Sequence, residues 1–181
     1  MGLYGVGRYE SMLRKSLGGW EKGEIPKSFS VDEPLLAEAL CLAAEDEEML
    51  ALAKKAGAKG INLCGMCCSG AEVLVRHGIP HAGNFMSTET ILVTGAVDAM
   101  TVDVQCIKQG LVKVAECYDT PLITTNPRCK IEGATHIEFH EHTPKDCTDE
   151  IVIRAIGRFK GRSKPVEIPQ IKNSGVHGFS H

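Results

Sequence analysis

The sequence lacks the features that indicate a membrane protein, a secreted protein or a nucleic-acid-binding protein. No apolar run approaches the roughly 18 residues that cross a bilayer. Arg8 and Glu10 stand where a signal peptide would have its apolar region. Lys and Arg number 20 against 23 Asp and Glu, and the resulting net charge of -3 provides no general attraction for a polyanion. We therefore predict a cytoplasmic protein with no membrane span and no nucleic-acid partner.

Three common catalytic and nucleotide-binding motifs are also missing. No Gly-x-Gly-x-x-Gly follows a predicted strand, no phosphate-binding loop with its lysine occurs, and no serine nucleophile elbow is present. Nucleotide binding and serine hydrolysis therefore have no support in the sequence. The bulk composition is ordinary, with 43% hydrophobic and 24% charged residues in a chain of 181, and this indicates one packed domain with appendages.

Cysteine, by contrast, is abundant, with eight residues in the chain. In a reducing compartment so many thiols serve metal, cluster or redox chemistry more often than disulfides. Cys41, Cys117 and Cys147 fall in predicted helices, and we expect them to be small buried side chains.

Short apolar strands alternate with helices along most of the chain, which predicts an α/β fold, a Rossmann-like mostly parallel sheet with helices on both faces. The expected division is an irregular leader at 1–26, the Rossmann-like domain at 27–163 and a linker-like tail at 164–181. Helices are expected at 34–56, 69–77, 87–94, 110–118 and 145–160, and strands at 60–64, 99–104, 121–125 and 135–139.

Cysteines and carboxylates follow four of the expected strands, and ligands of open α/β sheets collect at the carboxyl ends of strands. These residues are Cys64, Cys67 and Cys68 after the strand at 60–64, Asp103 and Cys106 after 99–104, Cys129 after 121–125, and Asp32 and Glu33 after a first strand ending near Val31. We therefore expect thiolate and carboxylate groups at one edge of the sheet.

The cluster of Cys64, Cys67 and Cys68 is compatible with three roles. A Cys-x-x-Cys pair between a strand and a helix suits a redox dithiol. The same spacing suits the start of a metal or iron–sulfur site, although a zinc site would need a second ligand pair that the sequence does not show. Simple burial is the third role, and the local motif does not separate them.

Longer stretches resemble the central Rossmann-like domain of the nickel-containing anaerobic carbon monoxide dehydrogenases. They are GINLCGMCCSGAEVLVRHGIP at 60–80, TGAVDAMTVDVQCI at 94–107, ITTNPRCKIEGATHIEF at 123–139 and KPVEIPQIKNSGVHGFS at 164–180. The similarity covers residues 24 to 181, and it is far more specific than a short motif.

The resemblance implies two ligands of the family's nickel–iron–sulfur cluster, the C-cluster, and no catalytic residue. Cys68 matches the second cysteine of the family's Ile-Cys-Cys motif, and Cys106 matches the cysteine of Asp-x-Gln-Cys. Asp32 stands at the position of the family's histidine ligand in Gly-His-x-Pro, so it is the weaker metal candidate. Just before the helix expected from Pro34, Asp32 also suits an N-terminal cap.

The function implied by the resemblance is the oxidation of CO with water to CO2, two protons and two electrons. Most ligands of the family's clusters lie in regions outside the matched stretch, so we expect a fragment or reduced member that is not active alone. The implied partners are the remaining domains or subunits, a second copy of the chain and a ferredoxin-like electron acceptor. The alternatives are a non-catalytic metal- or cluster-binding scaffold and a thiol redox protein.

Overall fold

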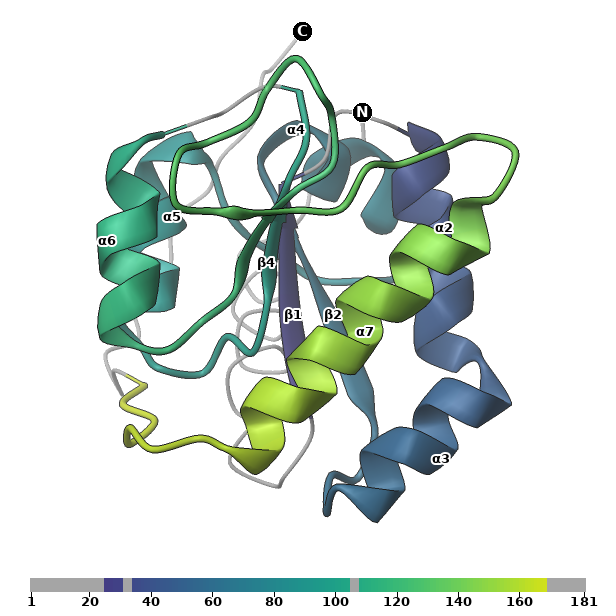
Figure 1. The fold of residues 1–181 in the computed structure, drawn as a ribbon, viewed down its shortest axis with the longest axis horizontal. Helices are drawn as coiled ribbons and strands as arrows, with labels where there is room; N and C mark the ends of the chain where they lie inside the picture. Colours follow the sequence, from purple (N-terminus) through teal and green to yellow (C-terminus); the bar gives the residue numbers. More distant parts are fainter. Residues whose placement is uncertain (1–24, 31–33, 105–107, 169–181) are drawn as a thin grey trace, which may run out of the picture.

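The structure is a computed structural model that describes residues 25–30, 34–104 and 108–168. Six parallel strands form one sheet in the order β3-β2-β1-β4-β5-β6 (Figure 1). The strands are β1 (Ile25–Ser30), β2 (Ile61–Met66), β3 (His81–Gly83), β4 (Met100–Val102), β5 (Leu122–Thr124) and β6 (Thr135–His136). This is the strand order of doubly wound Rossmann folds, and it confirms the α/β fold predicted from the sequence.

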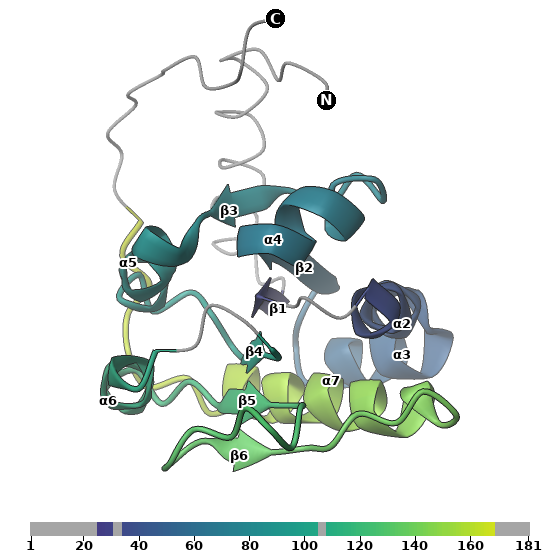
Figure 2. The same cartoon turned by 90° about the horizontal axis from the view of Figure 1, so that it is seen from above.

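Helices cover both faces of the sheet. Figure 2 shows α2 (Pro34–Glu45), α3 (Glu47–Lys55) and α7 (Pro144–Lys160) on one face, and α5 (Thr88–Leu92) and α6 (Gly110–Cys117) on the other. Three shorter helical pieces are α4 (Cys67–Ser69), the π-helical turn η2 (Gly70–Leu74) and the 3-10 turn η3 (Phe85–Ser87). Of the helices in the described ranges, none combines the length and apolarity of a bilayer-crossing segment.

The core consists of two apolar clusters, one on each face of the sheet. Successive strand residues point to opposite faces, so Leu63 joins the cluster under α2 and α7, whereas Cys64 joins the cluster under α5 and α6. In β5, likewise, Ile123 joins the cluster under α2 and α7, and Leu122 joins the cluster under α5 and α6. A strand that is buried on both faces has a continuous apolar run in its sequence. For this reason the short apolar runs between glycines indicated strands.

Two predicted helices differ in the structure. The helix expected at 34–56 is broken at Asp46, whose carboxylate accepts hydrogen bonds from the backbone N–H groups of Glu48 (2.9 Å) and Met49 (3.2 Å) and so caps the start of α3. The helix expected from Ser69 begins at Cys67 and becomes π-helical from Gly70.

Burial of the three helical cysteines was predicted correctly for two of them. Cys41 and Cys147 are buried, and burial raises the pKa of their thiols to about 11 and about 12 respectively. Cys117, at the end of α6, is exposed, so its predicted burial was wrong. The helix face that α6 buries is formed by Leu111, Val112 and Ala115 instead.

Candidate functional site

The central strands end level with one another at the carboxyl edge of the sheet. Ser30 of β1 pairs with Met66 of β2 on one side and with Val102 of β4 on the other, and Val102 in turn pairs with Thr124 of β5. The chain winds outward in opposite directions from β1 and β4. The gap between these two strands is therefore the position at which Rossmann-like folds bind their ligands.

The three metal candidates follow the three strands around this position. Cys68 lies just beyond β2, Asp32 just beyond β1 and Cys106 beyond β4. Asp32 and Cys106 themselves lie outside the described residues. Adjacent strands are about 4.8 Å apart, so the ends of β2 and β4, with β1 between them, are about 10 Å apart. A shared cavity for Cys68 and Cys106 stays a prediction.

The turn from β2 into α4, residues 65–70, is the most unusual stretch of the described backbone, and we refer to it as the cysteine elbow. Cys67 has a φ of 58°, a left-handed conformation that costs a non-glycine residue about 1 kcal/mol or more. A π-helical turn follows immediately, and such turns are frequent at functional sites. Cys68 is exposed at the tip of this elbow, and Figure 1 shows α4 at the carboxyl edge of the sheet.

Two glycines allow the cysteine elbow to fold back closely on β2. A Cβ atom on Gly70 would lie 2.5 Å from the carbonyl carbon of Gly65, and a Cβ atom on Gly65 would lie 2.6 Å from the Cα atom of Gly70. Real Cβ atoms essentially never approach other atoms so closely. The close contact of the two backbones therefore requires glycine at both positions.

A hydrogen bond from β3 also holds the cysteine elbow. The Nε2 atom of His81 lies 3.1 Å from the backbone carbonyl oxygen of Cys67. A carbonyl oxygen only accepts, so Nε2 carries the proton and donates. Burial lowers the pKa of His81 below its usual value and favours the neutral ring, although the bond to Cys67 opposes this shift. The sequence analysis did not assign a role to His81.

The loops after β4 and β5 are tied together at the carboxyl edge of the sheet. Asp103 is buried at the end of β4, and the Thr125 hydroxyl donates a 2.9 Å hydrogen bond to its Oδ1 atom. The thiol of Cys129 donates to the backbone carbonyl of Val104 at 3.3 Å. Cys129 was predicted to lie at this edge as a ligand, and in the structure it binds the backbone that leads toward Cys106.

The geometry of Cys64 disfavours the redox dithiol. Its side chain is fully buried within β2, where it packs in the cluster under α5 and α6. Thiol exchange requires an accessible attacking thiolate, and burial in apolar surroundings raises the pKa of a thiol. Within the described ranges, no group of three or more His, Cys, Asp or Glu side chains is arranged to hold a metal ion.

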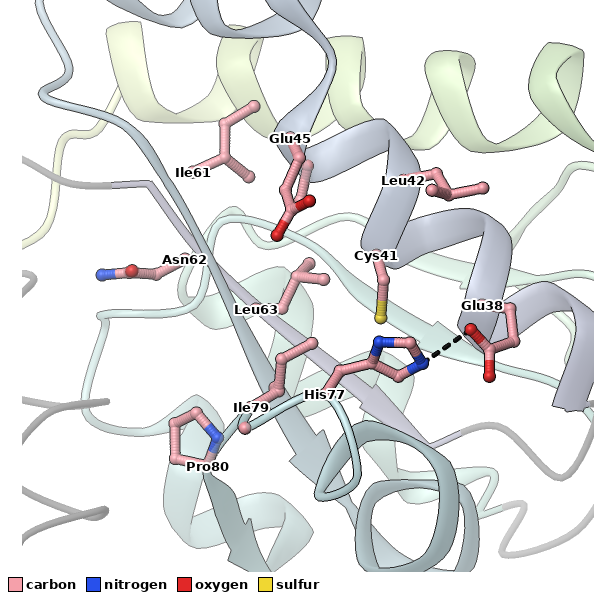
Figure 3. A pocket seen from close by; sticks show the side chains of 12 residues that line it. Glu38, Cys41, Leu42, Glu45, Ile61, Asn62, Leu63, His77, Ile79 and Pro80 are labelled. Carbon is pink, nitrogen blue, oxygen red and sulfur yellow. Dashed lines mark ion pairs between the residues drawn. The ribbon is translucent and has the colours of Figure 1, made fainter.

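A separate cavity of about 300 Å³ lies near the amino end of β2, beside α2 and the loop before β3. Figure 3 shows His77 facing Glu38, and the two form an ion pair of 2.6 Å, with Cys41 close by. Ile61 and Leu63 contribute apolar surface to the same cavity. This end of β2 is opposite to the cysteine elbow, so the cavity is separate from the candidate site.

The sequence profile of the Prismane/CO dehydrogenase family matches residues 32–181. The chain belongs to this family. Carbon monoxide dehydrogenase 1 from Methanosarcina mazei is 48% identical over 149 residues, which are 82% of this chain and 24% of that protein. The match confirms the resemblance that the motifs around Cys68 and Cys106 indicated.

Solved structures of carbon monoxide dehydrogenases have the same fold as this chain. Carbon Monoxide Dehydrogenase IV from Carboxydothermus hydrogenoformans superposes with a TM-score of 0.80 at 44% identity, over 91% of this chain and 26% of that one. A second structure, of an acetyl-CoA synthase/carbon monoxide dehydrogenase with NiZn[Fe4S4] and NiNi[Fe4S4] clusters, has a TM-score of 0.80 at 46% identity, over 91% of this chain and 24% of that one. The chain thus spans about a quarter of the length of these relatives.

Proposed function

We propose that this chain contributes two thiolate ligands, Cys68 and Cys106, to the nickel–iron–sulfur cluster of a carbon monoxide dehydrogenase. The observation that carries the proposal is the level ending of β2, β1 and β4 at the point where the sheet reverses its winding. In this family member, both cysteines follow strands that end at that point.

The chemistry of the donor groups fits part of such a cluster. Thiolates are the usual ligands of iron–sulfur clusters, and Cys68 is an exposed thiol at the tip of a strained elbow. Two thiolates are fewer than a cluster requires, and the described residues hold no larger ligand group. The remaining ligands therefore belong to other parts of the enzyme in this proposal.

Cys68 and Cys106 would hold the cluster, and the cysteine elbow would orient the first of them. When bound, such a cluster supplies Lewis-acid and redox chemistry for the reaction CO + H2O → CO2 + 2 H⁺ + 2 e⁻. We propose that Asp32 supports the amino end of α2, which begins two residues later at Pro34, and does not bind the cluster, because a carboxylate adds charge to an anionic thiolate cluster. The buried Asp103 and Thr125 pair would hold the backbone that precedes Cys106.

The proposal includes partners and a location for the protein. The two electrons would pass to a ferredoxin-like acceptor, and the missing ligands would come from the remaining domains or subunits, with a second copy of the chain among the candidates. A cytoplasmic location is part of the proposal, because Cys41, Cys117 and Cys129 are free thiols and thiols persist in reducing compartments.

A second candidate function is a scaffold that keeps the fold without the chemistry. The observation that favours it is Asp32 at the position of the family's histidine ligand, because a carboxylate suits a thiolate cluster less well than an imidazole does. This candidate predicts no cysteine-dependent binding of iron at the carboxyl edge of the sheet.

Iron binding by the full chain distinguishes the two functions. The protein is reconstituted anaerobically with iron, sulfide, nickel and an excess of small thiol, which can occupy vacant ligand positions, and bound iron is measured for the wild type, Cys68→Ser and Cys106→Ser. Cys117→Ser is the matched control, since Cys117 is an exposed cysteine on α6. We expect both site variants to lose iron and the control to keep it. Iron binding that is equal in all four proteins would contradict the cluster proposal.

A further inference from the structure

We infer that His81 is a positioning residue for Cys68, acting as a latch from β3 on the peptide group that joins Cys67 to Cys68. The importance of this latch for catalysis rests on the cluster role proposed for Cys68. The hydrogen bond from His81 does not depend on that role, because it is present in the described structure. Nothing in the sequence motif around the cysteines contains this residue, which lies fourteen positions after Cys67.

The bonded atom is the reason that His81 acts on Cys68. The peptide group is planar, so the carbonyl oxygen of Cys67 and the backbone nitrogen of Cys68 move together. A hydrogen bond that holds the Cys67 carbonyl oxygen therefore also fixes the orientation of this peptide plane, and with it the direction in which the Cys68 side chain leaves the backbone. Cys67 also has the left-handed φ of 58°, a conformation that is unfavourable for a non-glycine residue and that the surrounding contacts must hold.

The Cys67 carbonyl is held from two directions. The backbone N–H of Gly70 donates to it from within the turn, and the Nε2–H of His81 donates to it at 3.1 Å from the neighbouring strand. A carbonyl oxygen has two lone pairs, so it can accept both bonds. The bond from Gly70 is local to the elbow, whereas the bond from His81 ties the elbow to the sheet.

His81 is itself placed by the sheet and by a glycine. It is the first residue of β3 and pairs with Gly65, the residue of β2 at which the elbow begins. A Cβ atom on Gly70 would lie 3.0 Å from the Cδ2 atom of the ring. Gly65, Gly70 and His81 therefore pack as one unit, and the glycines leave the space in which the ring reaches the carbonyl.

The test uses side chains that keep or remove the donor at the Nε2 position. Phe fills the space of the ring without a donor, and Gln has an amide N–H that can take the place of Nε2–H. His77→Phe is the matched control, because it removes the ion pair with Glu38 near the amino end of β2 and leaves the elbow untouched. Circular dichroism first verifies that each variant is folded.

The primary readout is the rate at which iodoacetamide alkylates Cys68 in the native apoprotein, relative to Cys117 in the same sample, measured by peptide mass spectrometry. One lost hydrogen bond should raise the population of a released elbow about two- to tenfold, and because the released elbow presents Cys68 more freely than the native turn does, the ratio should rise in His81→Phe. The ratio should stay at the wild-type value in His77→Phe, and His81→Gln should restore it. An unchanged ratio in His81→Phe, or no restoration by Gln, would overturn the latch.

Bound iron after anaerobic reconstitution separates the latch from the proposed function. With both correct, His81→Phe lowers bound iron while His77→Phe keeps it. If the wild type binds no iron through Cys68 but the alkylation ratio still rises in His81→Phe, the latch stands and the cluster proposal fails. If the iron depends on Cys68 but the alkylation ratio does not respond to His81, the cluster proposal stands and the latch fails.

Discussion

Gly70→Ala adds one methyl group at the tightest point of the cysteine elbow, and we expect it to destabilise the fold by about 1–3 kcal/mol, the usual cost of overpacking. The new Cβ atom would lie 2.5 Å from the carbonyl carbon of Gly65, whereas ordinary contact begins at 3.4 Å, so the two backbones must separate by 3.4 - 2.5 = 0.9 Å. Side-chain rotation cannot relieve this contact, because both partners are backbone and β2 is hydrogen-bonded to β1 and β3.

Gly157→Ala is the matched control for this prediction. Gly157 is an exposed residue in the last turn of α7, and a Cβ atom there meets nothing within 4 Å. The same substitution should therefore stabilise the protein by up to about 1 kcal/mol through helix propensity.

Thermal denaturation followed by circular dichroism measures both changes. About 2–4 °C per kcal/mol is expected for a chain of this size, so Gly70→Ala should lower Tm by about 2–12 °C and Gly157→Ala should raise it by a few degrees. A Gly70→Ala variant as stable as the wild type would refute the close contact of the elbow with β2.

Four further results are expected. The isolated chain, reconstituted anaerobically and offered a viologen acceptor, should not oxidise CO, and CO- and nickel-dependent turnover by this chain alone would show that it holds the missing ligands. A bismaleimide cross-linker with a span of about 10 Å should join Cys68 to Cys106, since their strands are two positions apart in the sheet. Failure to cross-link in the folded protein would place the thiols apart. Asp32→His should raise the amount of bound iron and lower Tm slightly, because the carboxylate before α2 is lost. Loss of metal binding in Asp32→Ala would instead identify Asp32 as a ligand. Burial lowers the pKa of His81, so the stability that the neutral ring contributes is present above the unfolded pKa of about 6.5 and is lost as the pH falls below that value. His81→Phe should therefore flatten the plot of stability against pH on its acid side, and an equal slope in both proteins would count against His81 as the cause.

Most of the fold was predictable because strands that are buried on both faces leave a strong trace in the sequence. The run at 61–64 between two glycines is one example: a strand was expected at 60–64, and β2 covers Ile61–Met66. β3 was missed because His81–Gly83 contains a single buried apolar side chain, Ala82, and its strand conformation comes from pairing with β2. The break at Asp46 did leave a local signal, since Asp followed by two glutamates is typical of a helix start.

Some features of the candidate site can be predicted from the local sequence, and others depend on tertiary contacts. Cys68 was identifiable because it follows a strand and lies in a family motif. The strain at Cys67 and the contact of Gly65 with Gly70 depend on how the elbow folds back on β2, and no local pattern specifies this. The latch from His81 depends on the pairing of β3, so it is visible only once the strand order is known.

The two ends of the sheet have different physical roles. Near the amino end of β4, the fully buried Asp98 accepts hydrogen bonds of 2.7 and 2.8 Å from Arg162, and Arg158 donates to the backbone carbonyl of Tyr118 at 2.7 Å. These bonds join the end of α7 and the residues after it to the segments before β4 and after α6, with charged groups that are costly to separate once buried. At the carboxyl end the backbone carries strain at Cys67 and an exposed thiol at Cys68. A strained turn persists only where the surrounding structure holds it, and here the close contact of Gly65 with Gly70 and the hydrogen bond from His81 to the Cys67 carbonyl hold it.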